Sequence, residues 1–191
     1  MDNCIFCKIA AGEIPSTTLY EDDDVRVIFD IGPATKGHAL VIPKAHVANV
    51  FEIPNDLLGK AYSVAKKIAQ ALKETTGCEG INILQNNGEM AGQSVFHFHI
   101  HVIPRYEGDT ANIKWEQGTA DSDYLNELAG KVKEILSKKL ILYIGYEVLK
   151  LKDEKITEDT LRKALSGYMN IKGQEILDKE HYDVNDGFAY P

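Results

Sequence analysis

The chain has 191 residues, of which 44% are hydrophobic and 26% are charged, and its formal net charge is −8. This composition is typical of a globular protein with one good core and room for a small additional part, and the acidic balance argues against binding to a nucleic-acid polymer, which requires a basic surface. The apolar runs are shorter than the roughly 18 residues of a membrane helix, the N-terminal residues lack the pattern of a signal peptide, and three cysteines are too few for a disulfide framework. We therefore expect a cytoplasmic protein with no membrane partner.

The first elements in chain order are short strands. Residues 17–33 contain β-branched and aromatic residues on both sides of an acidic turn, which predicts two strands. Residues 37–46 predict a third strand that Pro43 ends.

A long helix and two more strands follow. Apolar residues recur at helical spacing over residues 55–77, where Asn55 can cap the first turn and Gly77 can end the helix. Residues 81–87 and 95–104 predict two further strands, which a glycine-containing turn connects.

The character of the sequence changes after Pro104. A polar stretch containing Trp115 leads to a second amphipathic helix, predicted over residues 123–139. Several strands and one long helix, followed by more helix, predict an α+β fold with a largely antiparallel sheet. We assign residues 1–139 to one domain and residues 140–191 to a C-terminal extension of unknown role.

Three of the six histidines lie within residues 97–103, which read "HFHIHVI". Side chains two residues apart in a strand share a face, so His97, His99 and His101 would line one side of a strand whose other side packs in the core. Two chemical interpretations stay open: the imidazoles bind a catalytic metal, or one of them is a nucleophile and its neighbours orient it.

The ten residues before this strand, "QNNGEMAGQS", are small and polar. Gly88 and Gly92 let backbone amides approach an anion closely, and Asn86, Gln93 and Ser94 add side-chain donors. Beside three histidines, this loop indicates a phosphate-binding segment.

The motifs "GQSVFHFHIHVIPR", "CIFCKI", "IPSTTLYEDDDVRVIFDI" and "KGHALVIPKAH" all occur between residues 4 and 105. Together they resemble the histidine-triad (HIT) superfamily, and in particular its Hint-type branch, as in bacterial Hit-like proteins with Cys-x-x-Cys. The resemblance implies a HIT-like fold and the activity of a nucleotidyl hydrolase or transferase that acts on an α-phosphate.

By its place in the motif, His99 would attack phosphorus and form a covalent nucleotidyl-histidine, which water then hydrolyses. The resemblance implies that His101, His38 and Ser94 assist this chemistry as further catalytic residues. The expected nucleotide-binding set combines Asp30 for the ribose, apolar walls for the base, and the loop and histidines for the phosphate: Asp30, Ile31, Phe29, Ile28, Phe6, Ile5, Ile9, Asn86, Gly92, Gln93, Ser94, His99 and His101.

Cys4 and Cys7 form a Cys-x-x-Cys pair outside any βαβ setting, which argues against a thioredoxin-like redox motif. A structural zinc ion needs four ligands, and the resemblance supplies His46 and His97 as the other two. On this hypothesis His97 binds the metal, His99 reacts and His101 assists. Cys78 has no partner in the pattern and is expected to be a buried apolar residue.

The leading hypothesis is a homodimeric hydrolase of purine nucleotide derivatives, with nucleoside phosphoramidates and related adenylylated compounds as substrates. Two alternatives remain: a dinucleoside polyphosphate hydrolase, and a nucleotide-binding or scaffolding module with vestigial activity.

Overall fold

The structure is a computed structural model that describes residues 4–151, 157, 160 and 163; the side chains of residues 139–151 are outside this description. The described residues divide into two compact units, of which the first ends at Lys114 and the second begins at Trp115. Most of the predicted extension, residues 140–191, therefore lies outside the described residues.

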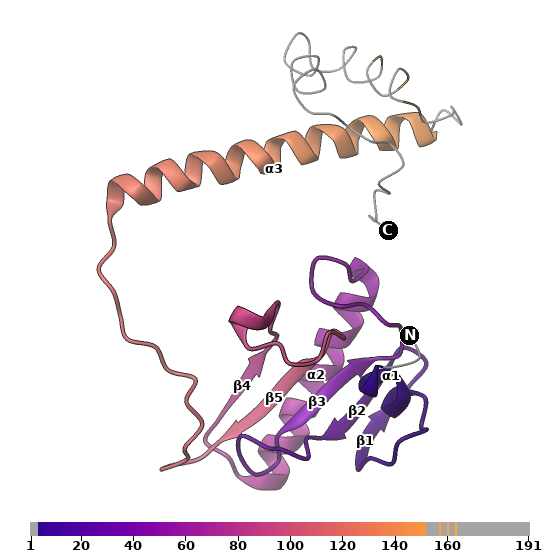
Figure 1. Ribbon diagram of the computed structural model, residues 1–191, viewed down its shortest axis with the longest axis vertical. Helices are drawn as coiled ribbons and strands as arrows, with labels where there is room; N and C mark the ends of the chain where they lie inside the picture. Colours follow the sequence, from indigo (N-terminus) through magenta and orange to yellow (C-terminus); the bar gives the residue numbers. More distant parts are fainter. Residues whose placement is uncertain (1–3, 152–156, 158–159, 161–162, 164–191) are drawn as a thin grey trace. The chain divides into compact units, whose positions relative to one another are not determined.

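The first unit contains a five-stranded sheet in which each pair of neighbouring strands is antiparallel (Figure 1). The spatial order is β1-β2-β3-β5-β4, and this confirms the prediction of an α+β fold with a largely antiparallel sheet. The strands are β1 (Thr18–Glu21), β2 (Val25–Phe29), β3 (Ala39–Pro43), β4 (Gly80–Leu84) and β5 (Ile100–Arg105).

Helix α2 (Asn55–Thr76) covers one face of this sheet, and in Figure 1 it passes behind β3 and β5. Its buried side chains recur every three or four residues, and they pack against Val25, Val27, Val41 and the inward side of β5. Gly77 ends the helix with φ of 68°, in the left-handed region that glycine adopts without strain.

The predicted N-cap of α2 is wrong by one residue. Pro54 is the capping residue, its carbonyl accepts the first helical hydrogen bond from the Leu58 amide at 2.9 Å, and no side chain caps the helix. Asn55 is therefore the first helical residue, because Pro54 keeps an extended backbone with ψ of 142° directly before it.

The short helix α1 (Ile5–Ala10), which is not among the predicted elements, lies on the opposite face of the sheet. Its buried residues Phe6, Ile9 and Ala10 pack with Ile28, Leu40 and Ile42. These strand residues alternate with the residues that face α2, so the period of two along each strand separates the two faces. His101 pairs with Leu40 in the sheet and therefore belongs to the α1 face.

Strand β4 ends at Leu84, three residues earlier than predicted. The side-chain nitrogen of Gln85, Nε2, donates to the Asn86 carbonyl at 3.0 Å. The side-chain nitrogen of Asn87, Nδ2, donates to Gln85 Oε1 at 2.6 Å. These local side-chain hydrogen bonds stabilise a turn instead of a strand ladder.

The second unit contains helix α3 (Ser122–Leu151), which extends beyond the predicted range of 123–139. The helix is continuous through residues 139 and 140, where the sequence places the domain boundary, and that boundary stays a prediction. The side chains of residues 122–137 are all exposed, as is Trp115. Among the described residues, no helix combines the length and the apolar character that a membrane span requires.

Candidate functional site

The histidine segment is not the continuous strand that its alternating pattern predicts, because β5 begins only at Ile100. Its neighbour β3 ends at Pro43, which has no amide hydrogen to continue the ladder. The Phe98 amide instead donates to the Val47 carbonyl at 2.6 Å. His97 and His99 therefore precede the strand, and only His101 belongs to it.

This irregular backbone gives the three histidines different surroundings. The His99 and His101 rings are adjacent, with their centroids 4.8 Å apart, whereas the His97 ring lies 5.2 Å from the ring of His46. The three imidazoles therefore do not form the expected single row: His99 and His101 form a pair, and His97 lies next to His46.

The protonated nitrogen of His99 follows from its hydrogen bond. Nδ1 lies 2.6 Å from the His97 carbonyl oxygen, and a carbonyl oxygen only accepts, so Nδ1 carries the proton. The lone pair of His99 is therefore on Nε2. Burial lowers the pKa of His99, and the hydrogen bond to the His97 carbonyl partly offsets this effect. A buried neutral imidazole with a free Nε2 is a competent nucleophile.

A chain of hydrogen bonds connects the two other histidines on this face. The Ala34 amide donates to His38 Nδ1 at 3.1 Å, so His38 Nε2 carries the proton that is shared with His101 Nδ1 at 3.0 Å. His101 then has its own proton on Nε2. Burial, followed by the nearby His99 and His38, lowers the pKa of His101 to about 4.

Asp30 lies next to His38, on the side away from His101. One carboxylate oxygen accepts the Gly32 amide at 2.8 Å, and the other lies 3.5 Å from His38 Nδ1. Possible metal-ligand atoms of Asp30, His38 and His101 lie within 4.8 Å of one another. However, both ring nitrogens of His38 already have hydrogen-bond partners, so the geometry favours a hydrogen-bond relay over a catalytic metal site.

The loop before the histidines is held by Gln93, whose side chain is buried. Gln93 Oε1 accepts the Gly88 amide at 2.8 Å, and Nε2 donates to the carbonyls of Ala48 at 2.7 Å and Val95 at 3.1 Å. Every polar group of this side chain is therefore engaged by the protein. In this structure Gln93 shapes the loop and has no free donor to offer a phosphate.

The other predicted loop residues are more open. Gly92 and Ser94 are exposed, and Asn86 is half-buried. Gly88 and Gly92 have φ of 85° and 84°, so the turn requires the conformational freedom of glycine at both places. The amides of Ala91, Gly92 and Gln93 donate to carbonyls within this loop, so the exposed Ser94 is the predicted loop residue that stays available to an anion.

The residues predicted to surround a base are divided by the fold. Phe6, Ile9 and Ile28 pack together on the α1 face, whereas Phe29 packs against the cluster on the α2 face. The other two residues predicted to surround a base, Ile5 and Ile31, are 47% and 99% exposed. Phe6 also lies edge-on to the rings of His99 and His97, at centroid distances of 4.9 Å and 6.0 Å.

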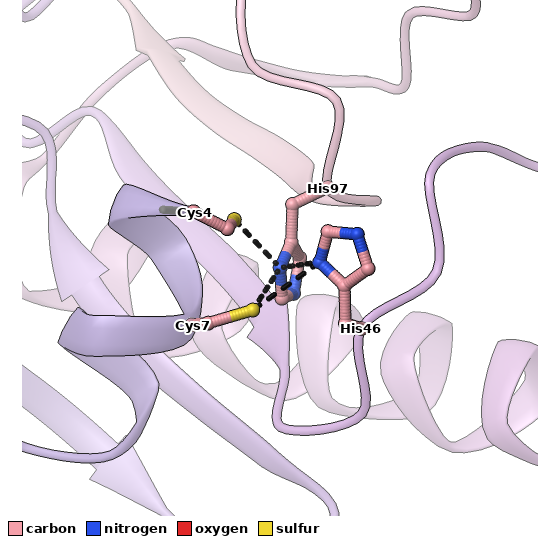
Figure 2. Close-up of side chains that lie close together, drawn as sticks. All are labelled: Cys4, Cys7, His46 and His97. Carbon is pink, nitrogen blue, oxygen red and sulfur yellow. Dashed lines mark hydrogen bonds between the residues drawn. The ribbon is translucent and has the colours of Figure 1, made fainter. Parts of the chain in front are cut away.

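The structure brings Cys4, Cys7, His46 and His97 together, with four ligand atoms within 4.8 Å of one another (Figure 2). Cys7 Sγ lies 3.2 Å from His46 Nδ1 and 3.5 Å from His97 Nδ1, and the two Nδ1 atoms are 3.3 Å apart. A tetrahedral zinc ion with ordinary bond lengths places its ligands about 3.3–3.8 Å apart. We call these four residues the tetrad.

His97 is oriented for this role by a second hydrogen bond. Its Nε2 donates to the Pro43 carbonyl at 2.8 Å, so the Nδ1 lone pair faces the two thiols and His46. Two thiols and two imidazoles with such separations fit zinc. Cys78 is buried and lies outside the tetrad, in agreement with its predicted packing role.

The sequence could not reveal two features of this site. The acceptor for His99 and the donor for His38 are backbone groups, of His97 and Ala34, and backbone groups leave no residue-type signal. The double ring contact of Phe6 depends on how α1 packs, and the sequence pattern of six residues does not determine that packing.

Comparison with known proteins gives one family and close relatives. The HIT domain family model matches residues 11–108. Adenosine 5'-monophosphoramidase HNT1 of Candida albicans is 43% identical over 141 residues, which cover 71% of this chain and 93% of that protein. A crystal structure of a member of the HIT family from Bacillus subtilis matches with a TM-score of 0.66 and 44% identity, covering 69% of this chain and 96% of that one.

A further match concerns the metal. The crystal structure of a Zn-bound histidine triad family protein from Mycobacterium smegmatis matches with a TM-score of 0.56 and 38% identity, covering 61% of this chain and 85% of that one. The family model ends at residue 108, before the second unit begins.

Proposed function

The chain belongs to the HIT family, and from this premise we propose that it is a nucleotide hydrolase whose nucleophile is His99. The observation that carries this proposal is the hydrogen bond from His99 Nδ1 to the His97 carbonyl, which leaves the Nε2 lone pair free. The proposed substrates are purine nucleotide derivatives with a leaving group on the α-phosphate.

In the first proposed step, His99 Nε2 forms a bond to the α-phosphorus. The bond from phosphorus to the leaving group breaks, and the leaving group departs with the electron pair and takes a proton from water. In the second step, water attacks phosphorus and releases a proton, and the bond to Nε2 breaks, which returns the lone pair to His99. The product is a nucleoside monophosphate.

The neighbouring groups have distinct proposed roles. His101 presents an Nε2 proton, by the relay described above, and this N–H would donate to a phosphoryl oxygen as charge develops. His38 holds His101 in this tautomer. The amide and the hydroxyl of the exposed Ser94 would contact the same phosphate, while Asp30 would accept hydrogen bonds from the ribose.

Nucleoside phosphoramidates are the proposed substrate class, and the name of the Candida albicans relative, adenosine 5'-monophosphoramidase, supports this choice. A dinucleoside polyphosphate hydrolase uses the same attack on an α-phosphate, with a nucleotide as the leaving group. A nucleotide-binding module with vestigial activity would bind nucleotide without turnover. The experiment below distinguishes these functions.

We also propose that the tetrad binds a structural zinc ion. The ligand separations and the donor set support this proposal, as does the Zn-bound relative from Mycobacterium smegmatis. The ion would clamp the N-terminal helix α1 to the histidine segment. The proposed homodimer rests on the family resemblance, and light scattering of the purified protein tests it. The proposed cytoplasmic location rests on the cysteine content and the N-terminal sequence pattern.

The test is intact-protein mass spectrometry during turnover of adenosine phosphoramidate, with the wild type beside His99→Ala. We expect a transient adenylyl adduct and release of AMP with the wild type, and neither with the variant. Diadenosine polyphosphate in parallel reactions tests the second substrate class. Binding of AMP without adduct or product from either compound would contradict the enzyme and support the binding module.

A further inference from the structure

We propose that His97 and Phe6 are positioning residues that couple the tetrad to His99. The proposal deepens the proposed function and rests on it, because the reaction it affects is the attack by His99. It assigns to metal binding an effect on the nucleophile in addition to an effect on the stability of the fold.

The first link between the two sites is His97, which contributes to both. Its Nδ1 lies among the tetrad atoms, 3.5 Å from the sulfurs of Cys4 and Cys7. Its backbone carbonyl accepts the Nδ1 proton of His99 at 2.6 Å. One residue therefore holds a metal-ligand nitrogen and the acceptor that determines which ring nitrogen of His99 is free.

The backbone around His97 depends on side chains for its position. Residues 95–99 lie outside β5, and the strand ladder does not hold them. Three hydrogen bonds hold this backbone. The His97 ring donates to the Pro43 carbonyl, the Gln93 side chain donates to the Val95 carbonyl, and the backbone amide of Phe98 donates to the Val47 carbonyl. Without the tetrad, the His97 ring keeps its hydrogen bond to the Pro43 carbonyl but loses its metal-side partners, and a shift of the ring would change the alignment of the His97 carbonyl with His99.

The second link is Phe6, which lies on α1 between the two cysteines. Its ring has edge contacts with both His97 and His99, at interplanar angles of 82° and 74°. Phe6 is buried, so displacement of α1 would move this ring against both histidines.

The end of α1 that carries the cysteines has few other anchors. Arg26 Nη1 donates to the Ile9 carbonyl at 2.9 Å and holds the far end of the helix. No side chain caps the beginning of the helix at Cys4. The packing of Phe6 on the sheet and the tetrad therefore hold the first turn of α1 together, and the tetrad is what connects this turn to the His97 ring.

The test measures the tautomer of His99 directly in the full-length protein, by nitrogen-15 NMR of histidine-labelled samples at a pH where the ring is neutral. We compare protein loaded with one equivalent of zinc, protein treated with a chelator, and the Cys7→Ser variant. Loaded protein should show His99 with the proton on Nδ1 alone. Without zinc, the signal should shift toward a mixture of both tautomers.

Kinetics on the same samples separate positioning from binding. The value of kcat for adenosine phosphoramidate should fall about tenfold without zinc, while KM changes less than about twofold, because the loss affects alignment of the nucleophile and not contacts with the nucleotide. Cys78→Ala, which removes a thiol outside the tetrad, is the matched control and should leave both measurements unchanged.

Phe6→Leu and Phe6→Tyr keep the tetrad complete and so remain informative even where zinc-free protein unfolds. In the leucine variant, we expect the NMR signal of His99 to show a mixture of tautomers and kcat to fall. In the tyrosine variant, which keeps an aromatic ring, the tautomer signal and kcat should resemble those of the wild type. A leucine variant that raises only KM would show that Phe6 merely lines the base pocket, and this result would overturn its role.

An unchanged His99 tautomer in folded, zinc-free protein would overturn the coupling through His97. Absence of turnover in loaded wild type would instead contradict the proposed function. The NMR comparison still decides the coupling in that case, so the two failures are distinguishable.

Discussion

At the scale of single residues, hydrogen bonds to the rings fix the tautomers of three neighbouring histidines, with the proton on Nδ1 in His99 and on Nε2 in His97 and His101. The His97 carbonyl sets the proton of His99 on Nδ1, and the Pro43 carbonyl sets the proton of His97 on Nε2. His101 receives its tautomer from His38 through a ring-to-ring hydrogen bond. Residue type alone would permit either tautomer for all three rings.

The low pKa of His101 predicts how stability depends on pH. The native ring has a pKa of about 4, below the usual 6.5, mainly because of burial. The unfolded chain binds this proton near pH 6.5, so the free energy of unfolding should decrease as pH falls from 6.5 to about 4, by up to about 3 kcal/mol from this group. Urea unfolding across this range measures the effect.

His101→Gln is the comparison for this measurement, because glutamine does not titrate. The variant should lose less stability than the wild type over the same pH interval, whatever its stability at pH 7. Parallel pH dependences for the two proteins would contradict a depressed pKa for His101.

Gln93 gives a second prediction at this scale. Gln93→Leu should lower the free energy of unfolding by about 2–3 kcal/mol, because the Gly88 amide and the carbonyls of Ala48 and Val95 lose their partner. Ser94→Ala, at an exposed neighbouring residue, should change stability by less than about 0.5 kcal/mol. Equal urea midpoints for the two variants would show that Gln93 is not an anchor of the loop.

At the scale of elements, each helix face matches one side of the sheet. The period of two in β2 and β3 sends alternate residues to α2 and to α1, and the period in α2 supplies a matching apolar stripe. The histidine pair and the tetrad both lie on the α1 side. The larger core beneath α2 therefore supports the sites without contributing to them.

Two glycines, one within α2 and one at its end, should respond in opposite directions to the same substitution. Gly77 has φ of 68°, so Gly77→Ala should destabilise the protein by about 1 kcal/mol. Gly59 is an exposed residue of the helix interior, and the position that an alanine β-carbon would take there has no neighbouring atom within 4 Å. Gly59→Ala should therefore stabilise the protein by about 0.5–1 kcal/mol. Thermal unfolding of both variants tests this, and equal signs would contradict the assigned end of α2.

At the scale of the whole molecule, both core clusters are formed by residues of the first unit. All four tetrad residues and the His38–His101 relay are in it as well. The side chains of α3 from residue 122 to 137 are exposed, so within the described residues this helix adds nothing to either core.

A chain that stops after residue 121 should therefore fold on its own. We expect it to keep its zinc stoichiometry and a melting temperature within a few degrees of the full chain, because neither core loses a buried side chain. Metal analysis and circular dichroism measure these properties. A truncated chain that fails to fold or to bind zinc would show that the second unit completes the first.

The chemical groups of this protein, and roughly the elements that carry them, could be read from the sequence. The alternation of "HFHIH", the Cys-x-x-Cys pair and the helical spacing over 55–77 are local patterns, and local patterns follow from the periods of strands and helices. They were sufficient for the fold class and for α2 to within one residue at its end, and with the family resemblance they pointed to the four residues that converge in the tetrad.

The chemical role available to each group depends on contacts that form only in the folded chain. The histidine strand is interrupted because Pro43, far away in the chain, cannot continue the ladder. In the fold, the buried Gln93 side chain bonds within the loop, and Phe29 and Phe6 lie on opposite faces of the sheet. Backbone carbonyls determine which ring nitrogens of His97 and His99 carry the proton. The contact between His97 and Pro43 joins residues 54 positions apart, and the hydrogen-bond partners are backbone atoms that every residue possesses, so no sequence pattern specifies them.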